Sequence, residues 1–458
     1  MYQIDFNKPQ HIHFIGIGGI SMSGLAEVLL GRGFTISGSD SHDSDLISNL
    51  RAHGAAITIG QKAGNITPDI DVVVYTAAVR PGNPEYDQAV ASGLPMLSRA
   101  ELLGEMMQNY SVSIAVAGTH GKTTTTSMVS HVFLAGNYDP TISVGGILPS
   151  IGGNIRVGNS ETFITEACEY TNSFLSLIPK IGMILNVDAD HLDFFKDLDD
   201  IANSFHIFAS QIPEDGFLVI NRDTRKFEEV TKDLACRIVT YSLESDADYT
   251  AGEIEHDEFG CGNFNCYENG TLLGHFSLRV PGIHNVSNAL ATIAASRILN
   301  IPADVIAEGL LQFTGADRRF EYKGKMGEVT VIDDYAHHPT EIKATLAAAA
   351  NYPHNELWVV FQPHTYTRTK ALLPEFAEAL HTADHIVLAK IYEAREKDIY
   401  GISSQDLADE LAKYGKDARY FTTFEEIEDH LRTHCKPGDI LITMGAGNVT
   451  DIGPALLK

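Results

Sequence analysis

Short apolar runs that end in glycine or in polar residues recur along the whole chain. Such runs begin at His11, Ala115 and Val329, and each opens a block of expected strands and helices. A buried parallel strand that feeds a helix through a tight turn produces this pattern in α/β proteins. The pattern predicts an α/β protein of three successive domains, which we place at residues 1–108, 109–314 and 315–458.

The composition agrees with several domains. The chain has 458 residues, 44% of them hydrophobic, and about 150 residues are enough for one domain with its own core. The net charge of −27 predicts repulsion of nucleic acid and of anionic lipid. The amino terminus lacks the layout of a signal peptide, and no uninterrupted apolar stretch is long enough to span a bilayer. We therefore expect a soluble cytoplasmic protein without a nucleic-acid or membrane partner, whose oligomeric state the sequence does not specify.

Two features raise the question of zinc or disulfides. Five cysteines are too few, and odd in number, for a disulfide framework. Cys261 and Cys266 lack a second pair of ligands. The adjacent His337 and His338 have no third ligand at a useful spacing, and a proline follows them, which favours a structured loop. We expect no structural zinc.

The most informative segment is residues 115–126, which read Ala-Val-Ala-Gly-Thr-His-Gly-Lys-Thr-Thr-Thr-Thr. An apolar run here enters a Gly-Lys-Thr turn and then a helix, which predicts a nucleotide triphosphate loop. Backbone N–H groups wrap the phosphates, Lys122 adds a positive charge, and the Thr123 hydroxyl can bind magnesium. The strict pattern has glycine where Val116 stands, so this version is narrower than the general one. The residues expected to contact ATP are Gly118, Thr119, His120, Gly121, Lys122, Thr123 and Thr124.

A second glycine turn opens the chain. A strand from His11 delivers Gly16, Gly18 and Gly19 to the start of a helix, and the next strand ends at Asp40. This arrangement resembles a dinucleotide fingerprint, in which the acidic residue holds a ribose hydroxyl. Ser23 and its neighbour stand where the last glycine is expected. The segment predicts that a phosphate group binds the helix start, while a tight turn without a ligand remains an alternative.

Polar side chains follow two apolar strands of the central block. They are Glu166, Glu169, Asn186, Asp190 and His191. Parallel sheets collect ligands at the carboxyl ends of their strands, so these residues are expected beside the phosphate loop. Magnesium prefers oxygen ligands, which suits Thr123 and Glu166, whereas His191 is a more unusual ligand that suits a second metal site. The sequence predicts a site for Mg²⁺, or for Mn²⁺ in its place.

Two further motifs lie near the expected boundary of the third domain. His284 and Asn288 are one helical turn apart and share a face. The amide could read an adenine edge, while an ordinary helix cap at Asn285 explains the segment equally well. Arg318 and Arg319 follow a glycine at the expected hinge, where an arginine can close onto a phosphate.

In this order, the motifs resemble those of the Mur ligase family over nearly the whole chain. The segments that carry the resemblance are Gly16 to Gly24, Gly118 to Thr125, Glu166 to Tyr170, Asn186 to His191, His284 to Ala289, Arg318 to Phe320, Asp333 to Glu341 and Phe361 to Thr369. The resemblance implies a Rossmann-like UDP-binding domain, a central ATPase-type domain with the phosphate loop, and a C-terminal Rossmann-like domain.

The resemblance also implies a reaction. ATP, UDP-N-acetylmuramate and L-alanine would give UDP-N-acetylmuramoyl-L-alanine, ADP and phosphate through an acyl phosphate, in the cytoplasmic part of peptidoglycan synthesis. ATP is then a co-substrate, and phosphoryl transfer needs mainly positioning and neutralisation of charge. The alternative within the family is the murein-recycling branch, which ligates a whole tripeptide to the same UDP-sugar.

Residue roles follow from the resemblance. The UDP-sugar would contact Gly16, Gly18, Gly19, Ser23 and Asp40. Thr123 and Glu166 would hold one metal ion and His191 a second, while His284 and Asn288 would contact the adenine and Arg319 a nucleotide phosphate. Tyr335, His337 and Arg368 would lie near the reacting carboxylate and the incoming amino acid. The residues expected to carry the chemistry are Lys122, Glu166, His191, His337 and Arg368.

Two positions distinguish the chain from some relatives. Thr365 stands where several relatives carry a second arginine. Siblings that add later residues use a carbamylated lysine downstream of the Asp-His segment, whereas the region around Ser204 has no lysine here. The second departure agrees with the alanine-adding branch.

Two other classes of function remain alternatives. A nicotinamide-dependent oxidoreductase would use the first glycine turn but leaves the phosphate loop unexplained. A non-catalytic ATP-binding regulator leaves the acidic strand ends and the Arg368 segment without a role.

Overall fold

The computed structural model describes residues 2–191, 194–394 and 396–458. It divides into two compact units, which are described separately. Unit 1 comprises Met1–Val187, Asp199–Tyr241 and Ala291–Ile301, and unit 2 comprises Asp188–Leu198, Ser242–Leu290 and Pro302–Lys458.

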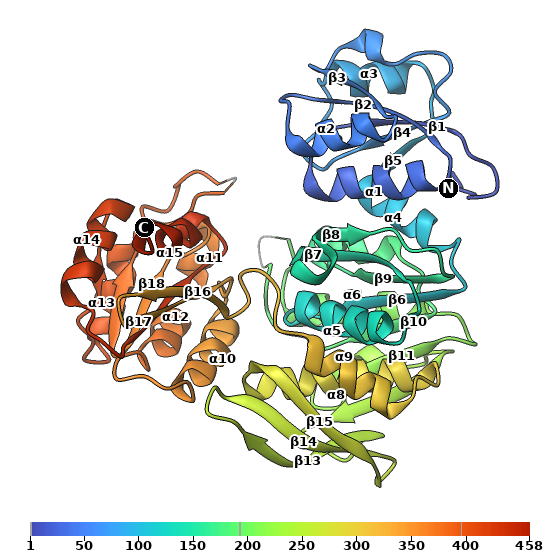
Figure 1. Ribbon diagram of the computed structural model, residues 1–458. Coiled ribbons are helices and arrows are strands. Elements are labelled where there is room, and N and C mark those ends of the chain that lie inside the picture. The colour runs from blue at the N-terminus through green and yellow to red at the C-terminus, as the bar shows by residue number, and fades with distance from the viewer. Residues whose placement is uncertain (1, 192–193, 395) are drawn as a thin grey trace. The chain divides into compact units, whose positions relative to one another are not determined.

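Unit 1 opens with a parallel five-stranded sheet of order β3-β2-β1-β4-β5 (Figure 1). Its strands are β1 (His11–Ile15), β2 (Thr35–Asp40), β3 (Ala56–Ile59), β4 (Val72–Tyr75) and β5 (Met96–Ser98). Its helices are α1 (Ile20–Gly31), α2 (Asp45–Ala52), η1 (Ala63–Asn65), α3 (Pro84–Ala91) and α4 (Arg99–Met107). Good caps fix these helices: Asn83 precedes Pro84 at the start of α3, and Ser98 with Glu101 forms a capping box on α4.

A second set of strands in unit 1 has the order β12-β11-β10-β6-β9-β7-β8. These strands are β6 (Val112–Ala117), β7 (Thr141–Leu148), β8 (Gly153–Arg156), β9 (Thr162–Glu166), β10 (Ile181–Ile184), β11 (Phe217–Asn221) and β12 (Arg237–Ser242). They pair in parallel except for the β7–β8 hairpin. The helical segments are α5 (Lys122–Ala135), η2 (Pro149–Ile151), η3 (Tyr170–Ser176), α6 (Leu198–Ser210) and α7 (Phe227–Thr231).

Helix α1 packs closely on this second set of strands. A Cβ atom on Gly24 would lie 2.2 Å from Cδ1 of Ile155 on β8, so only glycine allows the helix to approach. Gly24 therefore serves packing, because it allows α1 to lie directly against β8 (Figure 1).

Unit 2 contains an antiparallel ribbon and the C-terminal sheet. The ribbon consists of β13 (Tyr249–His256), β14 (Cys261–Glu268) and β15 (Thr271–Pro281), and it leads into α8 (Ile283–Ile298) and α9 (Ala303–Gln312). The C-terminal sheet has the order β16-β17-β21-β18-β19-β20, with only β16 antiparallel to its neighbour. Its strands are β16 (Glu321–Met326), β17 (Val329–Asp334), β18 (Leu357–Phe361), β19 (His385–Leu388), β20 (Arg419–Tyr420) and β21 (Ile440–Met444).

Alternating side chains of the C-terminal strands build two cores. Val359 packs with α10 (Pro339–Ala350), α12 (Leu373–Leu380) and α13 (Ser404–Ala412), whereas Val360 packs with α14 (Phe424–His434) and α15 (Ile452–Leu456). Successive residues of a strand point to opposite faces, so helices cover both sides of the sheet. The short α11 (Tyr366–Ala371) and η4 (Asn448–Asp451) follow β18 and β21.

The expected α/β class is confirmed, and several strands begin or end where the sequence predicts. The second strand of the chain spans Thr35–Asp40 as expected. The sequence did not predict the antiparallel ribbon β13–β15, the β7–β8 hairpin or the antiparallel edge strand β16.

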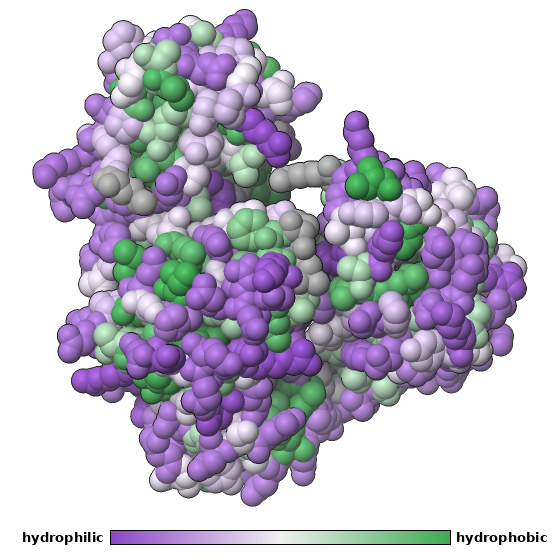
Figure 2. Space-filling view, turned by 180° about the vertical axis from the view of Figure 1, so that it is seen from behind, coloured by the Kyte–Doolittle hydropathy of each residue, from purple (hydrophilic) through white to green (hydrophobic). Residues whose placement is uncertain are grey.

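On the face drawn in Figure 2, hydrophilic residues cover much of the surface, with smaller hydrophobic groups among them. Of the helices in the described ranges, none combines the length and the apolar character needed to cross a membrane.

Candidate active site

The phosphate loop lies between β6 and α5 in unit 1. Gly118 has φ of +143° and Gly121 has φ of +83°, conformations that other residues rarely adopt. Gly121 is the N-cap of α5, so Lys122 and Thr123 stand in its first turn. The N–H groups of a first helical turn have no partner within the helix, which makes this turn a suitable anion site. Thr124, the next residue of the turn, is half-buried.

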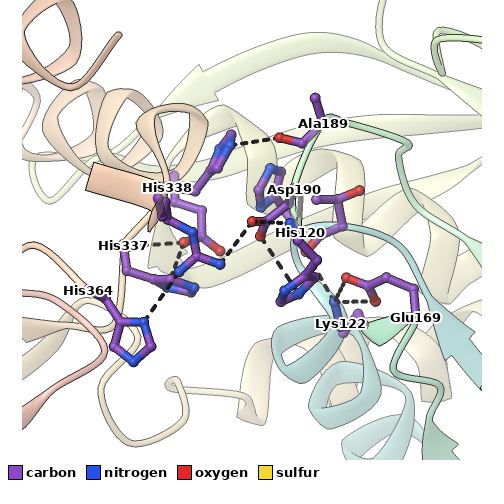
Figure 3. A network of polar contacts seen from close by, with 12 residues as sticks. His120, Lys122, Glu169, Ala189, Asp190, His337, His338 and His364 are labelled. Atoms are coloured by element: carbon purple, nitrogen blue, oxygen red, sulfur yellow. Dashed lines mark hydrogen bonds and ion pairs between the residues drawn. The ribbon is translucent and has the colours of Figure 1, made fainter. Parts of the chain in front are cut away.

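Lys122 is tied into the loop, as Figure 3 shows. Its Nζ donates to the carbonyl oxygens of Gly118 and Thr119 at 2.6 and 3.1 Å, and lies 2.9 Å from Oε2 of Glu169. Burial alone lowers the pKa of Lys122, but the charge of the buried Glu169 outweighs it and raises the pKa above its ordinary value. The ammonium is therefore held over the loop by a carboxylate.

Asn186, just beyond β10, fixes the shape of the loop. Its Oδ1 accepts from the His120 N–H at 2.8 Å, and its Nδ2 donates to the His120 carbonyl at 3.1 Å. The Thr119 N–H donates to the Asn186 carbonyl at 3.2 Å. The sequence placed Asn186 beside the phosphate loop, and the structure brings the two together. Its side chain binds loop backbone rather than facing a ligand.

Glu166 and Thr123 flank the strand β7. Oε1 of Glu166 accepts from the Gly145 N–H at 2.6 Å, and a Cβ on Gly145 would lie 2.5 Å from Oε2. A Cβ on the next residue, Gly146, would lie 3.2 Å from Cγ2 of Thr123. The structure thus brings Glu166 and Thr123 to the same short stretch of β7. No side chain of the described residues hydrogen-bonds the Thr123 hydroxyl. This hydroxyl and Oε2 of Glu166 therefore offer the hard oxygen ligands that magnesium prefers.

The first glycine turn connects β1 to α1. Gly16 has φ of +85°, and Gly19 is the exposed N-cap of α1. Oδ2 of Asp40 accepts from the Gly18 N–H at 2.8 Å, and it would lie 2.9 Å from a Cβ on Gly18. Asp40 therefore shapes the turn itself. Ser23 is buried in α1, where its hydroxyl donates to the Ile20 carbonyl at 3.0 Å.

In unit 2, several predicted residues form a polar cluster (Figure 3). Nη2 of Arg368 lies 2.9 Å from Oδ1 of Asp190, and both side chains are largely buried. Nε2 of His191 lies 3.9 Å from Oδ2 of Asp190. Burial raises the pKa of Asp190, but Arg368, followed by His191, outweighs it and holds the pKa well below the ordinary range. The cluster therefore keeps Asp190 ionised.

His337 and His364 continue this cluster. Nδ1 of His337 lies 3.2 Å from Oε2 of Glu341, and its ring centroid lies 5.8 Å from that of His364. Nδ1 of His364 is 3.4 Å from Nη1 of Arg368. The pKa of His364 is lowered to about 4, first by burial and then by the nearby His337 and Arg368. The sequence did not single out His364, because a histidine in a Gln-Pro-His segment carries no signal by itself.

Thr365, the departure from relatives, has an unusual backbone. Its φ is +65° and ψ is +147° at the N-cap of α11, which is a costly conformation for a β-branched residue. Its hydroxyl accepts from the Arg368 N–H at 3.4 Å, and its own N–H donates to the Tyr392 carbonyl at 2.9 Å. Thr365 thus supports the start of the helix that carries Arg368.

The two adjacent arginines have different surroundings. Nε of Arg318 lies 3.3 Å from the buried Asp333, and its Nη2 donates to the Gly447 carbonyl at 3.0 Å. Arg319 has no ion pair within 4.0 Å among the described residues, and its guanidinium lies 5.0 Å from the centre of the Tyr335 ring. Arg318 is held by contacts within the fold, so Arg319 is the better placed of the two to bind a ligand.

The adenine candidates lie at the start of α8. His284 is exposed, and its ring folds over Gly282, where a Cβ would lie 2.5 Å from Cε1. Asn288 is buried, and its Nδ2 donates to Oδ1 of Asn285 at 3.1 Å. Asn285 donates to the Pro281 carbonyl at 2.7 Å from the third position of the helix. The alternative of Asn285 as an ordinary N-cap is therefore wrong.

The predicted residues thus form separate groups. In unit 1, Lys122, Thr123 and Glu166 gather near the phosphate loop, and Gly16, Gly18, Gly19 and Asp40 form the turn before α1. In unit 2, His191, His337 and Arg368 form one cluster, Tyr335 adjoins Arg319, and His284 and Asn288 share the start of α8. In the described residues, no group of three His, Cys, Asp or Glu side chains converges as a metal site.

The fold and these groups define a multidomain α/β protein with a nucleotide phosphate loop. Models of one family match three successive parts of the chain: "Mur ligase family, catalytic domain" at residues 11–111, "Mur ligase middle domain" at 116–296 and "Mur ligase, glutamate ligase domain" at 318–447. The chain belongs to the Mur ligase family.

Individual relatives sharpen this comparison. The UDP-N-acetylmuramate--L-alanine ligases of Agathobacter rectalis and Lachnospira eligens are 58% and 57% identical to the chain, over 100% of both sequences in each pair. The structure of UDP-N-acetylmuramate-alanine ligase from Thermotoga maritima is 30% identical, with a TM-score of 0.79 over 98% of both chains. A murein peptide ligase from Psychrobacter arcticus is 26% identical, with a TM-score of 0.69 over 98% of both chains.

Proposed function

We propose that the chain ligates L-alanine to the carboxylate of UDP-N-acetylmuramate at the expense of ATP. The observation that carries this proposal is the full-length identity of 58% to a relative of that activity. The similarity to the alanine ligase structure also exceeds that to the murein peptide ligase, at 30% against 26% identity. The murein-recycling reaction is therefore the less favoured alternative. The cytoplasm, where ATP and UDP-sugars are available, is the proposed location.

The phosphate loop prepares the first chemical step. A carboxylate oxygen of the sugar attacks the γ-phosphorus of ATP, the bond to the bridging oxygen breaks, and ADP leaves. Phosphoryl transfer needs fixed positions and compensation of charge more than covalent help. Lys122 and the first turn of α5 supply that charge, and Glu169 and Asn186 hold the loop in shape.

The residues present fit a magnesium ion. Thr123 and Glu166 would hold it, and we propose that His191 takes part in a second metal site. Divalent metal ions neutralise the phosphate oxygens and polarise the carboxyl group when bound. Glu166 is half-buried beside Gly145, which fixes the direction of its carboxylate without consuming both of its oxygens.

The second step uses the cluster in unit 2. The amine nitrogen of L-alanine attacks the acyl carbon, the bond to the phosphate oxygen breaks, and the amine loses its proton. We propose that Arg368 binds the L-alanine carboxylate, because its guanidinium has further N–H groups beyond the one that pairs with Asp190. His337 is the proposed proton acceptor, since Glu341 binds the Nδ1 side of its ring and favours an Nε2 that can accept.

Other assignments complete the proposal. Arg319 would bind a nucleotide phosphate, Tyr335 would lie at the amino-acid side, and His284 with Asn288 would contact the adenine. Gly16, Gly18, Gly19, Ser23 and Asp40 would bind or shape the site of the UDP moiety. The proposed domains are 1–108 for the UDP-sugar, 109–314 for ATP and 315–458 for the amino acid, and the three successive family matches support this order.

Release of phosphate tests the function. The purified chain is incubated with ATP, Mg²⁺ and UDP-N-acetylmuramate, in parallel with L-alanine, with the murein tripeptide and with no amine. We expect release that depends on L-alanine and a product heavier by one alanyl residue. Release with the tripeptide alone would assign the chain to the recycling branch, and tight NAD(H) binding without ATP turnover would favour an oxidoreductase.

A further inference from the structure

Unit 1 contains a cavity of about 300 Å³ that no residue role above explains. The first turn of α1 and the start of α4 contribute Ile20, Ser21, Arg99, Ala100 and Leu103, and the facing residues come from β7, β8, β9, the turn after β9 and η3. Among the facing residues are Gly145 and Glu166, the proposed metal ligand. The cavity therefore extends from the start of α1, which follows the first glycine turn, to the carboxyl end of β9.

Among the described residues that line this cavity, Arg99 is the only lysine or arginine. Its Nη1 donates to the Ser21 hydroxyl at 3.2 Å, and no described carboxylate lies within 4.0 Å of the guanidinium. Two other arginines of unit 1 have a carboxylate partner: Arg51 lies 3.0 Å from Asp43, and Arg156 pairs with Asp139. Burial lowers the pKa of Arg99, as expected for a cation withdrawn from water. Its hydrogen-bond partner among the described residues is a neutral hydroxyl, which does not compensate its charge.

The position of Arg99 in its helix is also unfavourable. It is the first residue of α4, directly after the Ser98 N-cap. The N-terminus of a helix carries partial positive charge, so an acidic residue is favoured there and a cation is not. The start of α1, which carries Ser21, adds a second positive helix end to the same cavity. Glu101 supplies an acidic residue in the same turn, but it serves the capping box with Ser98. A cation at a helix start is the kind of broken local rule that is expected at functional sites.

We infer that Arg99 binds the diphosphate of the UDP-sugar, at the end of the cavity beside the first glycine turn. The inference rests on the proposed function, which supplies the substrate. The UDP-sugar carries two anionic groups, the diphosphate and the muramoyl carboxylate. The hydrogen bond to Ser21 favours the diphosphate, because it holds the guanidinium at the first turn of α1, where a phosphate is expected. The muramoyl carboxylate then belongs at the Glu166 end, beside the proposed metal site.

Calorimetric titration with UDP, UDP-N-acetylglucosamine and UDP-N-acetylmuramate tests this assignment without turnover. Arg99→Ala should weaken all three ligands about 10- to 100-fold, the size of a lost charge-assisted hydrogen bond. Arg99→Lys keeps the positive charge but not the planar guanidinium with its several N–H donors. Its affinities should therefore lie between those of the wild type and Arg99→Ala. The KM for ATP should not change.

The matched control is Arg237→Ala, which removes an exposed arginine of unit 1 that lies over the Phe217 ring. It should bind all three ligands as the wild type does. If Arg99→Ala binds the three ligands within twofold of the wild type, with an unchanged melting temperature, the inference is overturned but the proposed function is not. A loss confined to UDP-N-acetylmuramate would overturn it in favour of the carboxylate. A wild-type chain that binds none of the three would overturn the proposed function together with the inference.

Discussion

Replacing Asn186 with alanine should weaken ATP use far more than it weakens the fold. The change removes two hydrogen bonds between the Asn186 amide and the backbone of His120, with lengths of 2.8 and 3.1 Å. Each bond contributes about 1 kcal/mol net, so the loop loses about 2 kcal/mol of preorganisation. Since 1.4 kcal/mol corresponds to about a factor of ten, kcat/KM for ATP should fall about 30-fold.

The control for this prediction is Asn109→Ala, also in unit 1. Asn109 accepts from the Phe6 N–H at 2.9 Å and donates to the Ile4 carbonyl at 2.7 Å, so it likewise ties two backbone groups. It should lower the melting temperature with little effect on kinetics, because it supports the amino-terminal segment. Both variants thus remove an asparagine amide that binds two backbone groups, and only Asn186→Ala removes one that lies at the phosphate loop.

Initial rates at varied ATP, with UDP-N-acetylmuramate and L-alanine saturating, give kcat/KM, and thermal melts give stability. The reasoning fails if Asn186→Ala loses as much stability as Asn109→Ala while its kcat/KM for ATP stays within twofold of the wild type. In that case the loop would keep its shape without the amide.

Three further predictions concern charge and proton binding. Lys122→Ala should lower turnover about a thousandfold or more. It should also lower the melting temperature, because the buried Glu169 loses its ion pair with Lys122. Phosphate release at the wild-type rate would refute a role of Lys122 in phosphate binding. Gly145→Ala should raise the Mg²⁺ requirement about tenfold by pushing Glu166 aside, whereas Gly153→Ala, with open space around it, should not. His364 has its pKa lowered to about 4, so below about pH 6.5 the unfolded chain takes up a proton that the folded chain excludes. The melting temperature of the wild type should fall more steeply from pH 6.5 to 4.5 than that of His364→Gln, and parallel curves would contradict this.

Local sequence predicted the parallel parts of the fold well, since a buried parallel strand needs an apolar run and the following helix needs a glycine turn. The strand Thr35–Asp40 and the phosphate loop followed from such local signals. The ribbon β13–β15 did not, because its strands are half-exposed and mix polar with apolar residues. One signal was present: Asn269 and Gly270 both have positive φ, and this dipeptide is a common hairpin turn.

The site shows the same limit more sharply. Strand-end placement predicted that Asn186 and Glu166 lie near the phosphate loop, but not which backbone groups they bind. The pair of Arg368 with Asp190 joins residues 178 positions apart, and no local pattern encodes it. The availability of Arg319 also depends on distant contacts, since Arg318 is held by Asp333 and by the Gly447 carbonyl.

Three glycine-containing segments of unit 1 are each held by a polar residue that is distant in the sequence. Asp40 binds the N–H of Gly18, Glu166 binds that of Gly145, and Asn186 holds the loop that begins at Gly118. In each case a Cβ on the glycine would lie within 3.0 Å of a neighbouring atom, two of them the partner carboxylates themselves. A side chain at or just beyond the end of one strand thus fixes the backbone of another segment. Segments held in this way are ordered before a ligand arrives, so binding costs less conformational entropy. The glycines and their polar partners therefore act as pairs, and changing either member should loosen the same loop.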